Sequence, residues 1–258
     1  MKIVVLMKQV PDTWGERKLD TATGVSDRAA TDAVIDEIGE RALEVALTYR
    51  DSNKGTEVVV VSMGPASVTA ALRKGLSMGA DSAVHVLDDK LAGADAWLTS
   101  KVLAAVVARS GCDVVVAGNE STDGRGGVVP AMIAEHLSLA HLSFLNEVTL
   151  TDTEVRGSRS SETGSLEVHA ALPAIISITE ALPEARFPNF KGILTAKKKP
   201  LEVLSLADLG LDAGSTGNGR SVVVSTVQRP ARTAGTKTID EGNAGVELAE
   251  FLVAGRLI

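Results

Sequence analysis

The sequence predicts an α/β protein with a doubly wound, mostly parallel sheet, a β-hairpin extension and an extended C-terminal arm. Three observations support this fold class. Short β-branched runs alternate with longer segments of helical spacing as far as about residue 145. Alternating apolar and polar positions with polar turns follow, and apolar positions become sparse from about residue 201. We therefore divide the chain into an α/β domain, residues 1–200, and a C-terminal arm, residues 201–258.

The first half of the chain supplies the parallel sheet. Its apolar runs are continuous rather than alternating, which is expected when both faces of a strand are covered. The expected strands are residues 2–7, 57–63, 82–87 and 113–118. Helical spacing predicts helices over residues 33–50, 66–77, 95–109 and 126–139. Because strands and helices alternate, parallel pairing with helices between the strands is the natural arrangement.

The rest of the chain departs from this alternation. Residues 147–179 predict a hairpin with residues 156–165 near its tip, followed by a strand at 174–179. A tail with so few apolar positions would not form its own core, so we expect it to lie against another surface. Its expected loops are AGSTGNGR (213–220) and residues 229–243, and its expected helix is residues 244–258.

Composition narrows the function. The net charge of −7 and the pI near 5.2 disfavour nucleic acid as the main partner. The single cysteine, Cys112, excludes an internal disulfide or a CxxC redox pair and fits a reducing compartment. The opening run KIVVLM is typical of a strand rather than a signal peptide, and the apolar runs are far shorter than the ~20 residues of a membrane helix. We expect a cytoplasmic protein without membrane insertion.

Residues 118–127, GNESTDGRGG, lie between an expected strand and an expected helix. In open parallel sheets such positions hold ligands, and the N–H groups at a helix N-terminus attract anions. The loop contains no lysine and carries Glu120 and Asp123, which excludes the GxxxxGK[ST] type and disfavours polyphosphate hydrolysis. Backbone N–H groups could still hold one phosphate, with Asp123 as a turn or cap residue and Arg125 offsetting its charge. On glycine content alone, a solvated turn that binds nothing is an equally good interpretation.

Other candidate chemistry is sparse. The run SMGPAS, 62–67, occupies the matching place after the second strand and could form the opposite wall of a mononucleotide site. His136 and His141 fall on one expected helix but on different faces, so they are poor metal partners. His85 and His169 fall in strand-like runs and are expected to be ordinary packed or solvated residues. Without GxSxG, HExxH or Cys–His pairing, we expect a protein that holds ligands and partners and is not an enzyme.

Several blocks of the sequence resemble the β subunit of electron-transfer flavoprotein. The resemblance covers nearly the whole chain in the right order, and the run KGILTAKKKP is its most specific part. It implies that the sheet is of the adenine-nucleotide-binding type. The blocks are MKIVVLMKQVPDT (1–13), VSMGPASVTAALRKGLSMGAD (61–81), AGNESTDGRGGVVPAMIAE (117–135), RFPNFKGILTAKKKPLEV (186–203) and RTAGTKT (232–238).

The resemblance implies an αβ heterodimer. In this family the α subunit holds most of an FAD, while the β subunit buries an AMP, which is structural in the housekeeping members, and docks partner dehydrogenases. Electrons pass from an acyl-CoA or related dehydrogenase to the FAD and then to a membrane quinone oxidoreductase. The arm, residues 201–258, is then expected to pack on the α subunit.

The resemblance also implies site residues. Contacts to AMP would come from the first strand, the start of the first helix, the end of the second strand and the glycine loop. These residues are Leu6, Asp36, Glu37, Ile38, Gly39, Met63, Gly118, Asn119, Glu120, Ser121, Thr122, Asp123, Gly124, Arg125, Gly126, Gly127, Val128 and Val129. The partner-docking residues would be Pro188, Asn189, Phe190, Lys191, Gly192, Ile193 and Leu194.

Within that docking set, Phe190 is expected as an exposed apolar anchor on a rigid turn bounded by Pro188 and Gly192. The following run of lysines, 197–199, could steer acidic partners or be ordinary solvated surface. Two positions depart from the family: Ile38 replaces an aromatic residue and Thr13 a tyrosine, both near the flavin in relatives.

Three alternatives remain. The chain could be the β subunit of an electron-bifurcating flavoprotein, with a second FAD in place of AMP. An ATP pyrophosphatase of related fold would carry an SGG-x-DS-like loop after the first strand, where this chain has MKQVPDT. A free-standing nucleotide-binding module would have no need of the apolar-poor tail.

Overall fold

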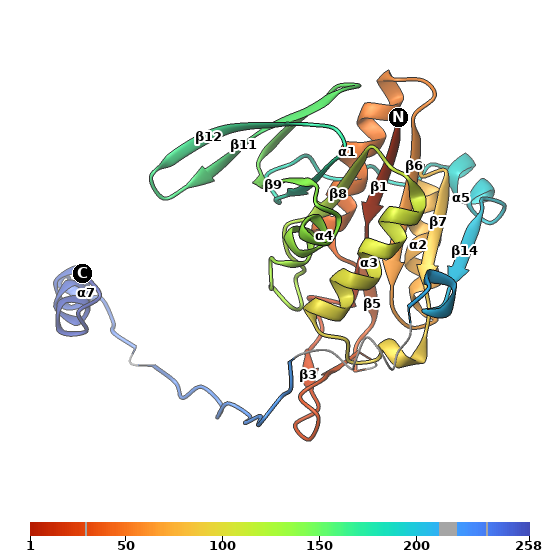
Figure 1. Cartoon of the computed structure of the whole chain (residues 1–258). Coiled ribbons are helices and arrows are strands. Elements are labelled where there is room, and N and C mark those ends of the chain that lie inside the picture. The colour runs from red at the N-terminus through yellow and green to blue at the C-terminus, as the bar shows by residue number, and fades with distance from the viewer. Residues whose placement is uncertain (29, 212–220, 236) are drawn as a thin grey trace. The chain divides into compact units, whose positions relative to one another are not determined.

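The chain forms two compact units, residues 1–225 and residues 226–258. The structure is a computed structural model that describes residues 1–28, 30–211, 221–235 and 237–258 (Figure 1). The loop expected at residues 213–220 lies outside the described residues.

The first unit is built on a seven-stranded sheet whose neighbouring strands all pair in parallel, as the sequence predicts. The strand order is β14-β7-β6-β1-β8-β13-β9. From β1 the chain adds strands first on one side and then on the other, so the order reverses between β1 and β8. This reversal is the topological switch point at which doubly wound sheets bind ligands. The strands are β1 (Lys2–Leu6), β6 (Glu57–Met63), β7 (Ser82–Val86), β8 (Val114–Gly118), β9 (Ala140–Leu145), β13 (Ala174–Ile178) and β14 (Leu201–Leu204).

Helices cover both faces of this sheet. One face packs against α1 and α2 through side chains such as Val5 and Val60. The other packs against α3 and α4, which lie in front of the sheet in Figure 1, through Val4 and Val115. Because both faces are covered, the central strands are apolar along most of their length, which accounts for their continuous runs. The helices are α1 (Glu37–Ser52), α2 (Val68–Met78), α3 (Ala96–Ser110) and α4 (Val129–Leu137).

Residues 9–35, here called the excursion, leave the sheet between β1 and α1. The helix expected from residue 33 begins instead at Glu37, because residues 33–35 form a strand and Asp36 caps the helix. Large apolar side chains of the excursion, such as Trp14, Leu19 and Val25, face solvent. Two short antiparallel ladders hold it together, β2 (Gln9–Pro11) with β5 (Ala33–Ile35) and β3 (Lys18–Leu19) with β4 (Ser26–Asp27).

The hairpin extension is confirmed. Three antiparallel strands form a separate sheet, and the turn between the last two falls within the expected tip. The strands are β10 (Glu147–Leu150), β11 (Glu154–Ser161) and β12 (Gly164–Ala171). The expectation that His136 and His141 share a helix is wrong. The helix ends at Leu137, Ser138 adopts a left-handed conformation with φ of 53°, and His141 lies on β9.

The segment that follows β13 contains a helix where a rigid turn was expected. Asn189 caps α5 (Phe190–Ala196) by accepting a hydrogen bond from Gly192 N, and α5 packs against α2. The expectation of a turn at Phe190 is therefore wrong. Beyond it, β14 pairs with β7, so the stretch in which the arm was expected opens with a strand of the central sheet. The short 3-10 helices of this unit are η1 (Asp89–Leu91) and η2 (Ala207–Leu209).

The second unit contains α7 (Ala244–Ala254), where helical spacing was expected. Its apolar side chains Val246, Leu248 and Phe251 are exposed, and none of its residues is buried among those described. Within the described ranges, the structure has no helix that is long and apolar enough to cross a membrane.

Candidate functional site

The carboxyl ends of β1, β6 and β8 carry the candidate ligand site. The residues after β1, the SMGPAS run at the end of β6 and the glycine loop at the end of β8 lie at the same edge of the sheet, because parallel strands point the same way. Met63 ends β6 and Gly118 ends β8. The structure thus brings the predicted first-strand, second-strand and loop residues together at the switch point.

The start of α1 joins the glycine loop through a buried carboxylate. Asp36 is 3% exposed, and its Oδ2 accepts hydrogen bonds from Thr122 N at 2.6 Å and Thr122 Oγ1 at 2.8 Å. Its Oδ1 accepts from Ile38 N at 3.1 Å, which caps the helix. Ile38 is buried, and its side chain lies 3.0 Å from where a Cβ on Gly118 would be. The predicted helix-start residues are therefore in contact with the loop.

Asp123 forms the second anchor of the loop. Its side chain is only 8% exposed and lies 2.8 Å from Lys8 Nζ and 3.2 Å from Arg28 Nη2. Burial alone would raise the pKa of Asp123, but hydrogen bonds from Lys8 and Ser121 and the charges of Lys8 and Arg28 bring that pKa to about 2. The expectation that Arg125 offsets the charge of Asp123 is wrong, because Arg125 lies 3.8 Å from Glu120 instead.

Lys8, Arg17 and Arg28 were missed by the sequence reasoning. Lys8 supplies the ammonium group that the loop itself lacks, from the residues just after β1. Arg17 donates to the Thr122 carbonyl, to Thr122 Oγ1 at 3.3 Å and to the Pro11 carbonyl at 3.1 Å. These three cations lie in segments without apolar periodicity. The only signal in the sequence for their role is their positive charge, which could complement the acidic glycine loop.

The end of the glycine loop leads directly into α4. Gly127 has φ of 63°, a left-handed conformation that favours glycine. The described part of the chain provides no side-chain cap for the first N–H groups of α4, so these groups remain available to an anion at the end of the loop. Phe144, a further residue that the sequence reasoning missed, also has a positive φ of 56°, and its Cζ lies 3.4 Å from where a Cβ on Gly127 would be.

Two buried polar atoms at this edge lack partners. Asn119 is 7% exposed and Ser62 is 2% exposed, and neither Asn119 Oδ1 nor Ser62 Oγ meets a hydrogen-bond partner among the described residues. Buried polar groups are normally paired, so unpaired ones at a ligand-binding edge suit donors or acceptors on a bound molecule. Gly124 and Gly126 in the adjoining loop are exposed. Together with the free helix end, these residues fit a small anionic ligand with polar hydrogen-bonding groups.

A buried histidine fixes the loop after β6. His85 is fully buried, as expected for a packed residue, with Nε2 3.0 Å from the Gly64 carbonyl and Nδ1 3.3 Å from Thr69 Oγ1. Ser67 in the same loop exchanges two hydrogen bonds with the side chain of Gln9, at 2.9 and 3.2 Å. This histidine therefore orders backbone and does not enter the ligand site.

Residues 186–194, here called the docking segment, lie on a different surface. Phe190, Ile193 and Leu194 are 77%, 54% and 60% exposed, so the interpretation that Phe190 packs on the sheet does not hold. Gly192 faces inward, because a Cβ there would lie 2.2 Å from the Ser77 carbonyl oxygen on α2. The predicted docking residues thus divide into an exposed apolar face and residues that cap or seat α5.

Arg186 fastens the docking segment to α1. Its Nε and Nη2 each donate to Glu44 at 2.8 Å, its backbone N donates to Glu44 Oε2 at 3.0 Å, and its Nη1 donates to Asp51 Oδ2 at 2.7 Å. The last lysine of the run 197–199 is also structural. Lys199 Nζ donates to the carbonyls of Leu76, Gly79 and Ala80 at the end of α2, at 2.6 to 3.2 Å.

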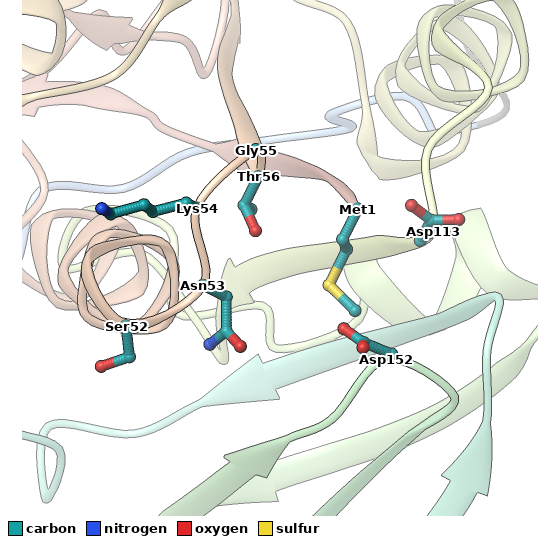
Figure 2. A pocket seen from close by; sticks show the side chains of 8 residues that line it. All are labelled: Met1, Ser52, Asn53, Lys54, Gly55, Thr56, Asp113 and Asp152. Atoms are coloured by element: carbon teal, nitrogen blue, oxygen red, sulfur yellow. The ribbon is translucent and has the colours of Figure 1, made fainter.

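An open pocket lies at the opposite, amino edge of the sheet (Figure 2). It is lined by residues that precede β1, β6 and β8, among them Met1 and Asp113, and by Asp152 from the turn between β10 and β11. Both carboxylates are already engaged, Asp113 by Lys2 N at 2.6 Å and Asp152 by Tyr49 OH at 2.8 Å. Across the described residues no cluster of three or more His, Cys, Asp or Glu side chains could hold a metal ion. The carboxyl edge remains the candidate site.

Comparison with known proteins gives a consistent result. Residues 23–209 match the family described as the electron transfer flavoprotein domain. The chain is 48% identical over 263 residues to "Electron transfer flavoprotein subunit beta" of Mycobacterium tuberculosis, covering 99% of each chain, and 47% identical to that of Mycobacterium leprae. It is 34% identical to "Caffeyl-CoA reductase-Etf complex subunit CarD" of Acetobacterium woodii, over 84% of this chain and 83% of that one. The chain belongs to the electron transfer flavoprotein family.

Proposed function

We propose that the chain is the β subunit of a heterodimeric electron-transfer flavoprotein, which binds one AMP and carries no bond-making catalysis of its own. The observation that carries the proposal is the switch point between β1 and β8, where a lysine-free glycine loop meets the uncapped start of α4. The similarity of this chain, over nearly its full length, to chains named as beta subunits supports the role in electron transfer.

One phosphate suits the phosphate end of the loop. The residues there, Gly126 to Val129, offer backbone N–H groups and no polar side chains, so the helix end must supply the attraction for an anion. The cations nearest the loop are already committed: Lys8 and Arg28 pair with Asp123. A nucleoside monophosphate needs no further cation, whereas hydrolysis of a polyphosphate would need a lysine and a metal ion.

The polar end of the site suits a nucleoside. Asn119 Oδ1 and Ser62 Oγ are buried polar atoms without partners in the described chain. Ser62 lies on β6 and Asn119 directly follows β8, and these two strands flank β1. We assign the AMP contacts to Leu6 at the end of β1, Asp36 to Gly39 at the start of α1, Met63 at the end of β6, and Gly118 to Val129.

The partner subunit is proposed as an α subunit that holds most of the FAD, which supplies the redox chemistry. In the second unit of this chain, the exposed apolar side chains of α7 provide a surface that a partner can bury. We propose that residues 201–258 include the contacts to that subunit. The exposed face of α5 is then left to dock an acyl-CoA or related dehydrogenase, with a quinone oxidoreductase as the electron acceptor.

A second FAD in place of AMP is the competing proposal. The likeness to a subunit of a caffeyl-CoA reductase complex supports keeping it. The committed cations weaken it, because a dinucleotide adds a second phosphate to be neutralised.

Counting nucleotides tests the proposal directly. The heterodimer is purified with its α subunit, denatured, and its FAD and AMP are measured. One of each is expected; two FAD and no AMP would establish the competing proposal. Gly127→Val should lower AMP content while FAD content stays unchanged, because a β-branched side chain at φ of 63° is strained and would crowd Phe144.

A matched control separates the effect of backbone strain from the effect of changing the ligand site. Gly111 has a similar φ of 57°, lies at the end of α3, and has no atom within 4 Å of a Cβ built on it. Gly111→Val should therefore keep its AMP. If both variants lose AMP equally, the loss reflects general destabilisation and the loop loses its assignment.

A further inference from the structure

Asp123 joins three segments that lie far apart in the sequence. It sits in the glycine loop, while Lys8 follows β1 and Arg28 lies in the excursion, 115 and 95 positions away. The carboxylate is nearly buried at 8% exposure, whereas both cationic side chains are 45% exposed. The carboxylate thus lies beneath the two cations and is shared by them.

The excursion depends on these polar contacts for its position over the loop. At its base it is held by the β2–β5 ladder, but further out Trp14 and Leu19 are exposed. Arg17 reaches the loop at Thr122, and Arg28 reaches it at Asp123. A segment held by charged contacts with little apolar burial opens at lower free energy than the core.

We propose that Asp123 is a positioning residue that ties the excursion to the glycine loop, so that the two segments open together to exchange the nucleotide. This deepens the proposed function and rests on it. In this tie the carboxylate acts through Lys8 and Arg28. With its pKa at about 2, it stays ionised at neutral pH, so the tie persists unless a partner or a mutation disturbs it.

A second anchor makes the proposal distinctive. Asp36 holds Thr122 to the rigid start of α1 and does not touch the excursion through any contact given for the described residues. The loop thus has a fixed anchor on a helix and a movable anchor on the excursion. Loss of Asp123 should loosen the excursion around Arg28 and the part of the loop at residue 123, while Thr122 stays held by Asp36 and still binds Arg17.

The test uses the full-length chain in its complex with the α subunit. Amide hydrogen exchange is measured in Asp123→Asn, which removes the charge and keeps the shape. Exchange in residues 9–35 and 118–128 should rise together, about tenfold, which corresponds to about 1.4 kcal/mol. Release of bound AMP should accelerate by a similar factor, while amides of β1 and β8 keep their wild-type protection.

Two further variants sharpen the test. Arg28→Gln should raise amide exchange in the same two segments. The double variant should exchange no faster than Asp123→Asn alone, because both substitutions break the same contact between residues 28 and 123. Lys18→Gln is the control: Lys18 lies in the excursion, 3.8 Å from Glu16, and has no contact with the loop among those given. It should leave both segments at wild-type exchange.

The outcomes separate the tie from the nucleotide assignment. If Asp123→Asn loosens the loop but leaves residues 9–35 unchanged, or if the two variants are additive, the tie is overturned. If Asp123→Asn fails to fold, Arg28→Gln, which alters an exposed side chain, decides the question alone. Absence of AMP from the wild-type complex would overturn the proposed function, while the coupled exchange would still establish or overturn the tie.

Discussion

The glycine loop and the docking segment are held by ion triads of opposite sign. In the loop, the carboxylate of Asp123 lies between two cations; in the docking segment, the guanidinium of Arg186 lies between Glu44 and Asp51. The central group is 8% exposed in the first triad and 32% exposed in the second. Both triads join residues about a hundred positions apart or more.

The difference lies in what each triad is fastened to. Asp123 is tied to a lysine and an arginine that are half exposed, and one of them sits on the solvent-facing excursion. Arg186 makes a two-pronged contact with Glu44 on α1, and such planar, bidentate pairs fix direction as well as distance. We therefore expect the glycine loop to open more readily than the docking segment, which is held rigidly against α1.

The largest effect is expected from disrupting the packing of α5 against α2 at Gly192. In Gly192→Val the new Cβ would lie 2.2 Å from the Ser77 carbonyl oxygen, so α5 must move away from α2. Electron acceptance from the dehydrogenase at limiting concentration should fall by more than about thirtyfold, because the whole exposed face of α5 is displaced, while AMP content stays at the wild-type value. Wild-type rates in this variant would show that α5 need not be seated for docking.

Truncating the apolar anchor comes next. Phe190→Ala should weaken dehydrogenase binding by about 2 kcal/mol, roughly thirtyfold, because exposed aromatic anchors dominate such interfaces. Reduction by dithionite, which needs no docking, should be unchanged. Phe187→Ala is the comparison, since Phe187 is 94% exposed but lies outside the helix. A larger loss from Phe187→Ala would move the anchor off α5.

Removing the contacts of Arg186 with Glu44 and Asp51 should have a smaller effect, spread over the docking segment. Arg186→Met should raise hydrogen exchange in residues 186–196 and lower stability by about 1–2 kcal/mol, since charged hydrogen bonds at a partly exposed site are lost. AMP content should not change, because the loop has its own triad. If amide exchange in the docking segment of this variant equals that of wild type, the rigidity of the segment comes only from the packing of α5 against α2.

The same triad predicts a pH dependence. Burial would raise the pKa of Glu44, but the hydrogen bonds and charge of Arg186 outweigh it and lower that pKa; the hydrogen bond from Arg186 lowers the pKa of Asp51. Lowered carboxyl pKa values add stability above the unfolded-state values of 4.5 and 3.8, and this stability is lost as pH falls through the lower folded values. Wild type should lose protection of residues 186–196 below about pH 4, and Arg186→Met should lack this loss.

The smallest effect concerns the lysine run. Lys199→Met removes an ammonium group from three carbonyls at the end of α2 and should cost about 1 kcal/mol of stability. Lys197→Met and Lys198→Met alter exposed side chains and should leave the melting temperature unchanged. Slower dehydrogenase encounter in these two controls would show that they steer the partner.

The sheet could be predicted from the sequence because its signal is local. Continuous runs such as 57–63 and 113–118 report strands covered on both faces, and each became a strand of the parallel sheet. The glycine loop was found for the same reason, since a strand end, glycines and a helix start follow one another. The strand at 33–35 was missed because its pairing partner lies more than twenty positions earlier.

The features that could not be predicted depend on tertiary contact. The helix at Phe190 was taken for a turn because Pro188 and Gly192 bound it; it forms because Gly192 fits against α2 and Asn189 caps it. The cations of the loop triad lie in segments without periodicity, and their role depends on which carboxylate they meet. Phe144 carries a left-handed conformation that nothing in its own neighbourhood indicates.

The two edges of the central sheet bear on how the chain behaves at high concentration. Exposed strand edges invite pairing with further copies, which leads to aggregation. At one edge, β9 is packed against β11 and β12 of the hairpin sheet. At the other, β14 is only four residues long, follows Pro200, and carries Glu202, paired with Arg109 at 3.0 Å. The sheet is thereby protected from edge-to-edge growth, so self-association of the isolated chain should arise from the exposed apolar side chains of α5 and α7.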